Sequence, residues 1–156
     1  INTFATSILL DKLKDNGKFL FISTSEIYSG NNSESYIESD IGNTTPLHPR
    51  APYIESKRCG ETLVNNHFIK HKNSFSARLA LAYGPGTKKN DHRVLNNFIE
   101  KAIIHKEINL LDSGSDLRTY CYITDAVTLF WRILFFGKSP IYNVGGISEI
   151  SILDLA

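Results

Sequence analysis

Short apolar runs alternate with longer stretches of helical periodicity along this chain, and that alternation restricts its fold more than any other feature. The clearest run, Phe19-Leu20-Phe21-Ile22, predicts a buried strand over residues 18–24. Residues 53–71 carry apolar side chains at helical spacing, and Pro52 suits the start of that helix. Strands that alternate with helices favour an α/β fold with a mainly parallel sheet.

The other elements are predicted from the same two periodicities. We expect helices over 2–15 and 93–105, and a further helix to Phe136 with Thr124 as its N-cap and Asp125 in its first turn. We expect strands over 74–81, 108–111 and 141–144, loops over 29–50, after Tyr83 and over 112–117, and the start of another helix at 151–156. The predicted inward face of the 93–105 helix consists of Val94, Leu95, Phe98, Ile99, Ala102 and Ile103.

Composition excludes several classes of protein. The 156 residues suffice for one domain with a core, 42% of them are hydrophobic, and the net charge of +1 comes from scattered Lys and Arg. These values give no sign of a nucleic-acid or membrane surface, and the apolar runs fall short of the roughly 20 residues that span a bilayer. Cys59 and Cys121 lack metal-ligand spacing, so we expect two reduced thiols, no metal site and a cytoplasmic protein.

Tyr53 and Lys57 are four residues apart and share one face of the predicted helix. A free tyrosine, with a pKa near ~10, is a poor base at neutral pH. An ammonium one turn away favours the phenolate, which can take a proton from a sugar hydroxyl as a hydride leaves its carbon. By itself this spacing on a surface helix usually carries no function.

A hydroxyl at the end of the first strand strengthens that interpretation. Thr24 follows the apolar run, at the position where α/β sheets bind their ligands, and Ser25 and Glu26 come directly after it. The Thr24 hydroxyl could hydrogen-bond the same substrate oxygen as Tyr53. The plainer alternative is that these polar residues only make turn contacts.

These motifs resemble the extended branch of the short-chain dehydrogenase/reductase superfamily, which contains nucleotide-sugar epimerases, dehydratases and decarboxylases. The resemblance spans nearly the whole chain, in blocks at 23–28, 49–58, 77–85, 90–99, 114–125 and 141–145. It implies a doubly wound, parallel-sheet NAD(P)-binding domain of the Rossmann type with a small substrate-binding subdomain.

The resemblance also implies residue roles. Thr24 would polarise the sugar 4-oxygen, Tyr53 would be the base, and Lys57 would hold the nicotinamide ribose and favour the phenolate. Ser25 and Glu26 match the catalytic pair that varies with reaction type, and Ser23 would contact the cofactor. Arg93 and Arg118 match substrate-binding arginines, whose planar forks grip phosphate oxygens. For each arginine alone, a solvated surface role is the simpler interpretation.

Within the branch, the resemblance is greatest to UDP-glucuronate decarboxylases, which share Thr-Ser-Glu and the Lys-Arg that ends the tyrosine motif. The dTDP-glucose 4,6-dehydratases carry an acid where this chain has Ser25, and a nucleotide-sugar 4-epimerase is a further alternative. Leu81 and Gly86-Thr87 depart from the usual pattern near the substrate, so the sugar and the nucleotide base stay open.

The family's glycine-rich turn, which seats the cofactor pyrophosphate on a helix N-terminus, does not occur in this sequence. We therefore expect a segment of a longer protein that is inactive by itself. Residues 1–82 would be the second half of the NAD(P)-binding domain, 83–125 mainly the substrate subdomain, and 126–156 a returning helix and strand with the start of another helix.

The choice between NAD and NADP is open, although the resemblance favours NAD. It further implies a homodimer formed through helices 2–15 and 53–71. The alternatives are a non-catalytic sugar-nucleotide-binding relative and a reductase of small ketones. An intact Thr24, Tyr53 and Lys57 argues against the first, and the long loops and Arg118 argue against the second.

Overall fold

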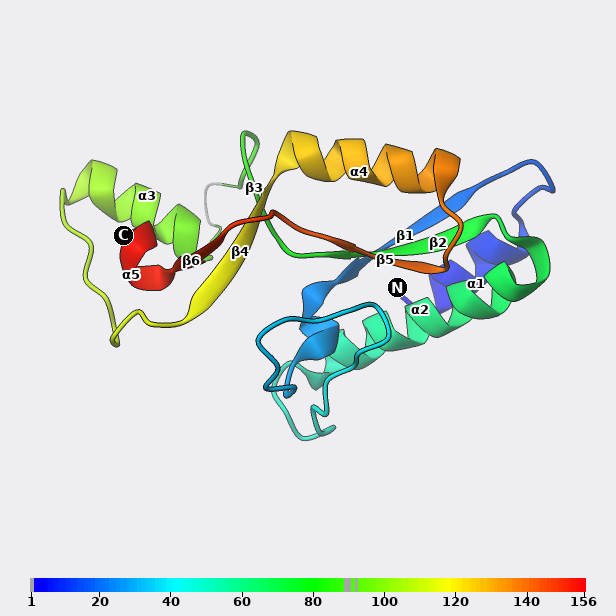
Figure 1. Ribbon diagram of the computed structural model, residues 1–156, viewed down its shortest axis with the longest axis horizontal. Helices are drawn as coiled ribbons and strands as arrows, with labels where there is room; N and C mark the ends of the chain where they lie inside the picture. The colour runs from blue at the N-terminus through cyan, green and yellow to red at the C-terminus, as the bar shows by residue number, and fades with distance from the viewer. Residues whose placement is uncertain (1, 89–90, 92) are drawn as a thin grey trace.

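The computed structural model describes residues 2–88, 91 and 93–156. Two small sheets organise this part of the chain (Figure 1). The first contains the parallel strands β1 (Phe19–Thr24), β2 (Ser74–Leu79) and β5 (Ile141–Val144), in the order β1-β2-β5. The second contains β3 (Leu81–Tyr83), β4 (Leu117–Tyr122) and β6 (Glu149–Ser151), with β4 parallel to β3 and antiparallel to β6.

Helices cover both faces of the first sheet. Figure 1 shows α1 (Phe4–Asp11) and α2 (Ala51–His71) on one side and α4 (Ile123–Phe136) on the other. The α3 helix (Val94–Ile104) and the short α5 (Ile152–Leu155) lie with the second sheet. The predicted α/β fold with a parallel sheet is confirmed.

The core lies between the first sheet and the helices that cover it. Phe75, Ala77 and Val144 pack with Phe68 of α2 and Ile133 of α4, and a smaller cluster joins Leu10, Phe21 and Val64. The α2 helix approaches β1 closely because Gly60 has no side chain, and a Cβ atom there would lie 2.3 Å from the Phe21 ring. This approach brings the Tyr53–Lys57 face of α2 to the sheet.

Several predicted elements agree with the structure. The strands near 18–24 and 141–144, the helices near 2–15, 53–71 and 93–105, and the loop after Tyr28 are all present. Pro52 lies in the first turn of α2, Asp125 lies in the first turn of α4, and residues 152–155 form the final helix.

Other predictions were wrong. Residues 108–111 form no strand, and Leu111 is fully exposed; the strand in this region is β4, which begins at Leu117. The predicted strand 74–81 breaks at Ala80, where the chain leaves the first sheet for the second. Tyr122 is the N-cap of α4 in place of Thr124, because the helix already begins at Ile123.

The predicted inward face of α3 is also wrong in large part. Phe98 is buried, but Val94, Ile99 and Ile103 are exposed.

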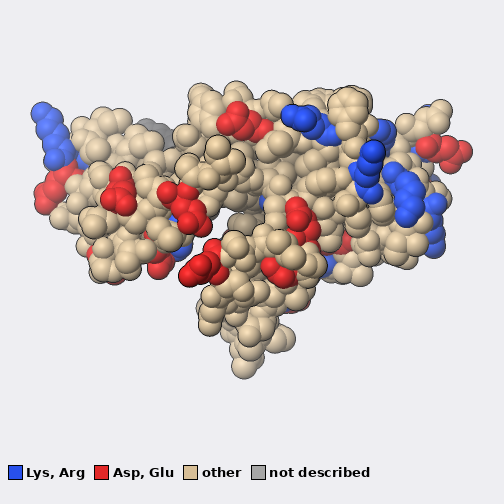
Figure 2. Space-filling model, viewed as in Figure 1, with Lys and Arg blue, Asp and Glu red and all other residues tan. Residues whose placement is uncertain are grey.

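Charge on the molecular surface is mixed: Figure 2 shows Lys and Arg gathered where α2 and α4 end, and Asp and Glu spread over the middle. In the described ranges, no helix combines the length and apolar character needed to cross a membrane.

Candidate active site at the carboxyl end of the parallel sheet

The end of β1 carries the predicted catalytic hydroxyl. Thr24 is buried, and its Oγ1 accepts a hydrogen bond from the backbone N–H of Glu26 at 3.2 Å. This bond caps the short 3₁₀ helix η1 (Ser25–Tyr28), so Ser25 and Glu26 occupy its first turn. The Thr24 hydroxyl keeps its own proton to donate. Residues at this edge lie where open parallel sheets bind ligands.

Tyr53 and Lys57 lie on one face of α2, both partly buried. Lys57 Nζ donates to the Ile22 carbonyl at 2.7 Å and lies 5.8 Å from the centroid of the Tyr53 ring. Burial lowers the pKa of the Lys57 ammonium from its usual value. The predicted base and its predicted cation therefore meet beside the end of β1.

Arg50, which the sequence analysis gave no role, joins two predicted catalytic residues. Its Nε and Nη2 donate to the two carboxylate oxygens of Glu26 at 2.9 and 2.5 Å. Its guanidinium carbon lies 4.7 Å from the centroid of the Tyr53 ring. The hydrogen bonds and negative charge of Glu26 raise the pKa of Arg50. Tyr53 thus has cations three residues before it and four residues after it.

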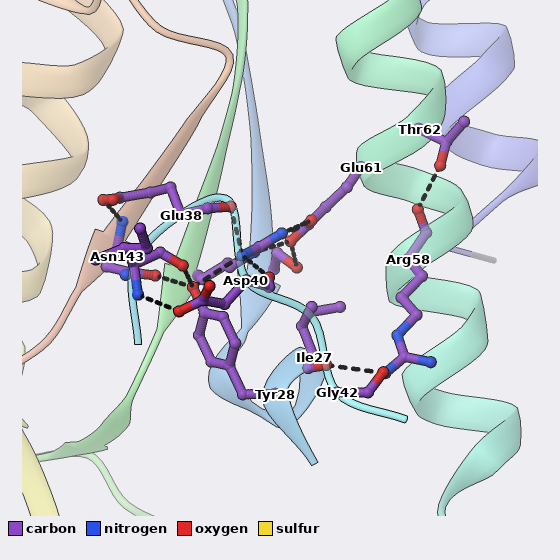
Figure 3. A network of polar contacts seen from close by, with 12 residues as sticks. Ile27, Tyr28, Glu38, Asp40, Gly42, Arg58, Glu61, Thr62 and Asn143 are labelled. Atoms are coloured by element: carbon purple, nitrogen blue, oxygen red, sulfur yellow. Dashed lines mark hydrogen bonds and ion pairs between the residues drawn. The ribbon is translucent and has the colours of Figure 1, made fainter. Parts of the chain in front are cut away.

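A largely buried network of hydrogen bonds ties the strand ends to α2 (Figure 3). We call Ser23, Tyr28, Glu61, Arg78 and Asn143 the strand-end network. Glu61 accepts from Arg78 at 2.8 Å and from the Ser23 hydroxyl at 2.5 Å. The Tyr28 hydroxyl accepts from Arg78 at 2.8 Å and donates to Asn143 at 2.6 Å. The ends of β1, β2 and β5 are therefore fixed relative to one another.

The same network holds the loop that covers the strand ends. Arg78 Nη1 donates to the backbone carbonyls of Glu38 and Asp40 at 3.0 and 3.2 Å. The backbone N–H of Asn143 donates to the Glu38 carboxylate at 2.9 Å. Burial disfavours the charged form of Arg78, but the hydrogen bonds that Arg78 donates to Glu61 and Tyr28 outweigh this effect, so its pKa lies above the usual value. The network is structural scaffolding for the site.

Ser23 was predicted to contact the cofactor. Its side chain is 3% exposed, and its hydroxyl proton is directed to Glu61. A cofactor role for Ser23 stays a prediction, and the visible role of this side chain is to fasten β1 to α2.

The two predicted substrate-binding arginines come together in a second place. Arg93 precedes α3 and Arg118 lies on β4, and both line a cavity of about 230 Å³. We call this cavity the arginine pocket; its other lining residues are Leu81, Ala82, Tyr83, Val94, Leu95, Asn96 and Tyr120. The Thr24, Tyr53 and Lys57 group is not part of this lining. Asn90 and His92, from the sequence block that contains Arg93, lie outside the described residues.

Each arginine of the pocket is paired with the aspartate two residues before it. Arg93 Nε donates to both carboxylate oxygens of Asp91 at 2.9 Å, and Arg118 Nη2 donates to Asp116 at 2.8 Å. Hydrogen bonds from Arg93 hold the pKa of Asp91 well below its usual range. Both arginine side chains remain accessible, so an anionic ligand can reach them by competing with the aspartates.

Sequence reasoning missed Arg50, Glu61 and Arg78, although signals were present. Arg50 lies at i−3 from Tyr53, within contact distance on a helical turn. Glu61 follows Lys57 by four residues on the same face of the helix. Arg78 is a charged residue within a buried strand, and a buried charge requires a partner.

No group of three or more potential metal ligands occurs in the part of the chain that the structure describes.

Comparison with known proteins places these features in a family. The family model described as "NAD dependent epimerase/dehydratase family" matches residues 1–145. This chain belongs to that family. It is 31% identical to UDP-glucuronic acid decarboxylase 6 of Arabidopsis thaliana, over 99% of this chain and 46% of that protein. It is 29% identical to the dTDP-D-glucose 4,6-dehydratase of Mus musculus, over 100% of this chain and 43% of that protein.

Solved structures give the same fold. UDP-glucuronic acid 4-epimerase from Bacillus cereus, in complex with UDP-glucuronic acid and NAD, aligns with a TM-score of 0.76 at 27% identity, over 98% of this chain and 48% of that one. The dTDP-glucose 4,6-dehydratase of Bacillus anthracis, in complex with NAD, aligns with a TM-score of 0.79 at 22% identity, over 97% of this chain and 48% of that one. These neighbours confirm a Rossmann-type fold. The chain spans about half the length of the relatives that it matches.

Proposed function

We propose that the protein carrying this chain is an NAD-dependent nucleotide-sugar enzyme that works through a 4-keto intermediate, most similar in activity to UDP-glucuronate decarboxylase. The observation that carries the proposal is the position of Tyr53 at the carboxyl end of the sheet, between the cations of Arg50 and Lys57. Arg50 also binds Glu26, which follows Thr24 at the end of β1. The family and its named relatives support it.

The residues at the sheet end suit the first step of such a reaction. Tyr53 takes the proton of the sugar 4-hydroxyl as hydride leaves C4, and Thr24 donates a hydrogen bond to the same oxygen. Lys57 stabilises negative charge on the phenol oxygen. NAD, when bound, supplies the hydride acceptor. Tyr53 and Lys57 are the residues of this chain that would hold it, and Ser23, whose hydroxyl donates to Glu61, would contribute through its place at the end of β1.

Ser25 favours decarboxylation over loss of water. A carboxylate at C5 lies β to the new C4 ketone and leaves as carbon dioxide without an acid to protonate a hydroxyl. A 4,6-dehydratase needs such an acid for the C6 hydroxyl, and a serine side chain is too weak an acid for that task. The dehydratase alternative is supported by Glu26, whose carboxylate is paired with Arg50 and is the candidate base at this sheet end.

The arginine pocket would take the nucleotide diphosphate. Arg93 and Arg118 offer two guanidinium groups to phosphate oxygens, and the apolar side chains around them suit a base. In this arrangement, residues 83–125 serve mainly as the substrate subdomain. The sugar would then extend from the pocket toward Tyr53.

The test is a substrate comparison with the full-length protein. Incubated with NAD, it should convert UDP-glucuronate with release of carbon dioxide and leave dTDP-glucose unchanged, as measured by mass spectrometry of both reactions. Loss of water from dTDP-glucose, with UDP-glucuronate untouched, would move the assignment to the dehydratases.

We also propose a cytoplasmic homodimer, formed through α1 and α2. Its support is the apolar surface of α1, where Phe4, Ile8 and Leu9 are 75%, 44% and 55% exposed. Sedimentation should give a dimer for the full-length protein and a shift toward monomer for Phe4→Asp. A monomer at high concentration of the unchanged protein would overturn the proposal.

A further inference from the structure

Arg50 makes two contacts that no known role of this chain explains. It grips both oxygens of the Glu26 carboxylate, and its guanidinium lies against the ring of Tyr53. Glu26 belongs to η1, which follows β1, whereas Tyr53 belongs to the first turn of α2. About 25 residues of chain separate the two, and the Arg50 side chain connects them directly.

The geometry suits positioning more than stability. The Arg50 and Glu26 side chains are 56% and 35% exposed, and ion pairs with that much exposure contribute little to folding stability. A bidentate fork nevertheless fixes the direction of a carboxylate, and a cation against an aromatic face fixes the ring beneath it. One side chain therefore sets the orientation of two others at little benefit to the fold.

We propose that Arg50 is a positioning residue, which orients Glu26 and Tyr53 toward one reacting sugar. The proposal rests on the proposed function of this site. Because Tyr53 already has Lys57 one turn after it, Arg50 supplies the second cation, on the N-terminal side of the ring.

The planar guanidinium group of Arg50 predicts which substitutions lower activity. Lysine keeps the charge but cannot bind both oxygens of Glu26 or stack flat on Tyr53. Arg50→Lys should therefore recover only part of what Arg50→Gln loses. Since Arg50 acts through Glu26 as well as Tyr53, combining Arg50→Gln with Glu26→Gln should cost less than the two single losses multiplied together.

The experiment uses the full-length protein with NAD and UDP-glucuronate. Arg50→Gln should lower kcat about 10–100-fold, the size expected when reacting groups are misplaced by about an ångström. KM and the Kd of UDP, measured by calorimetry, should stay within about twofold, because Arg50 is not part of the arginine pocket. Arg132→Gln, a change at an exposed arginine of α4, is the matched control and should leave kcat and Kd unchanged.

The outcomes separate the proposal from the function on which it rests. An unchanged protein that converts neither UDP-glucuronate nor dTDP-glucose overturns the proposed function. An active protein in which Arg50→Gln keeps its kcat, or in which Arg50→Lys restores kcat fully, overturns the role of Arg50 as a bidentate clamp. A kcat loss explained by a fall of several degrees in Tm would make Arg50 merely structural, and it too overturns the proposal.

Discussion

Arginine–carboxylate pairs occur in both the strand-end network and the arginine pocket, and their burial differs greatly. The Arg78 and Glu61 side chains are 5% and 7% exposed. Glu61 also accepts a hydrogen bond from Ser23, and Arg78 also donates one to Tyr28. The Arg93 and Arg118 side chains are 55% and 42% exposed, each beside its own aspartate. The buried pair therefore holds the strand ends to α2, whereas the arginines of the exposed pairs are accessible to solvent and to a ligand.

Burial explains the difference. When a buried charge loses its partner, no water can take the partner's place, so separating the two charges of a buried pair is costly. An exposed arginine can leave a carboxylate for a ligand phosphate at small cost, because water compensates throughout. The contrast supports a role in the fold for the first pair and the proposed role in ligand binding for the other two, and three substitutions test both roles.

The largest effect is expected in the strand-end network. Arg78→Gln should lower the free energy of unfolding by about 3–5 kcal/mol, because it leaves Glu61 buried and unpaired. Urea denaturation of the full-length protein measures it. The control is Asp116→Asn, which breaks an exposed pair and should cost less than about 1 kcal/mol. Equal losses in the two variants would contradict the contrast in burial.

An intermediate effect is expected in the arginine pocket, on binding. Arg118→Gln should weaken UDP binding about 10–100-fold, the equivalent of one lost charge-assisted hydrogen bond, with little change in stability. Calorimetric titration with UDP measures the change in Kd. If both Arg118→Gln and Arg93→Gln bind UDP with unaltered affinity, the proposal that the nucleotide binds in the arginine pocket is wrong.

The smallest effect should come from removing a competing carboxylate. Asp91→Asn frees Arg93 from its ion pair and should strengthen UDP binding about two- to fivefold at low salt, with less gain at high salt. The measurement is the Kd of UDP at two ionic strengths. Weaker binding in this variant would mean that Asp91 orients Arg93 for the ligand and does not compete with it.

The sequence predicted the parts of the fold that have strong local signals. The apolar run before Ser23 and the proline at position 52 mark β1 and α2 clearly, so the positions of Thr24, Tyr53 and Lys57 followed. The second sheet was harder, because β4 reads Leu117-Arg118-Thr119-Tyr120-Cys121-Tyr122, without an apolar run. Its existence depends on pairing with β3 and β6, which are distant in sequence.

Side-chain partnerships were the least predictable feature. Residues 108–111 have the composition of a strand but form none, and α3 exposes apolar residues that periodicity assigned to a core. Arg50 and Glu26 meet only because the loop before α2 returns to η1. Local patterns could place each residue on its element, but not select its partner across the fold.

The most direct test of the account is single-turnover hydride transfer in the full-length protein. Mixed with NAD and UDP-glucuronate, the unchanged protein should form NADH in a rapid phase. Tyr53→Phe should bind UDP with the same Kd but form NADH about 10²–10⁴-fold more slowly, the usual cost of losing a general base. NADH formation at the original rate in Tyr53→Phe would contradict the assignment of Tyr53, with its flanking Arg50 and Lys57, as the centre of the reaction.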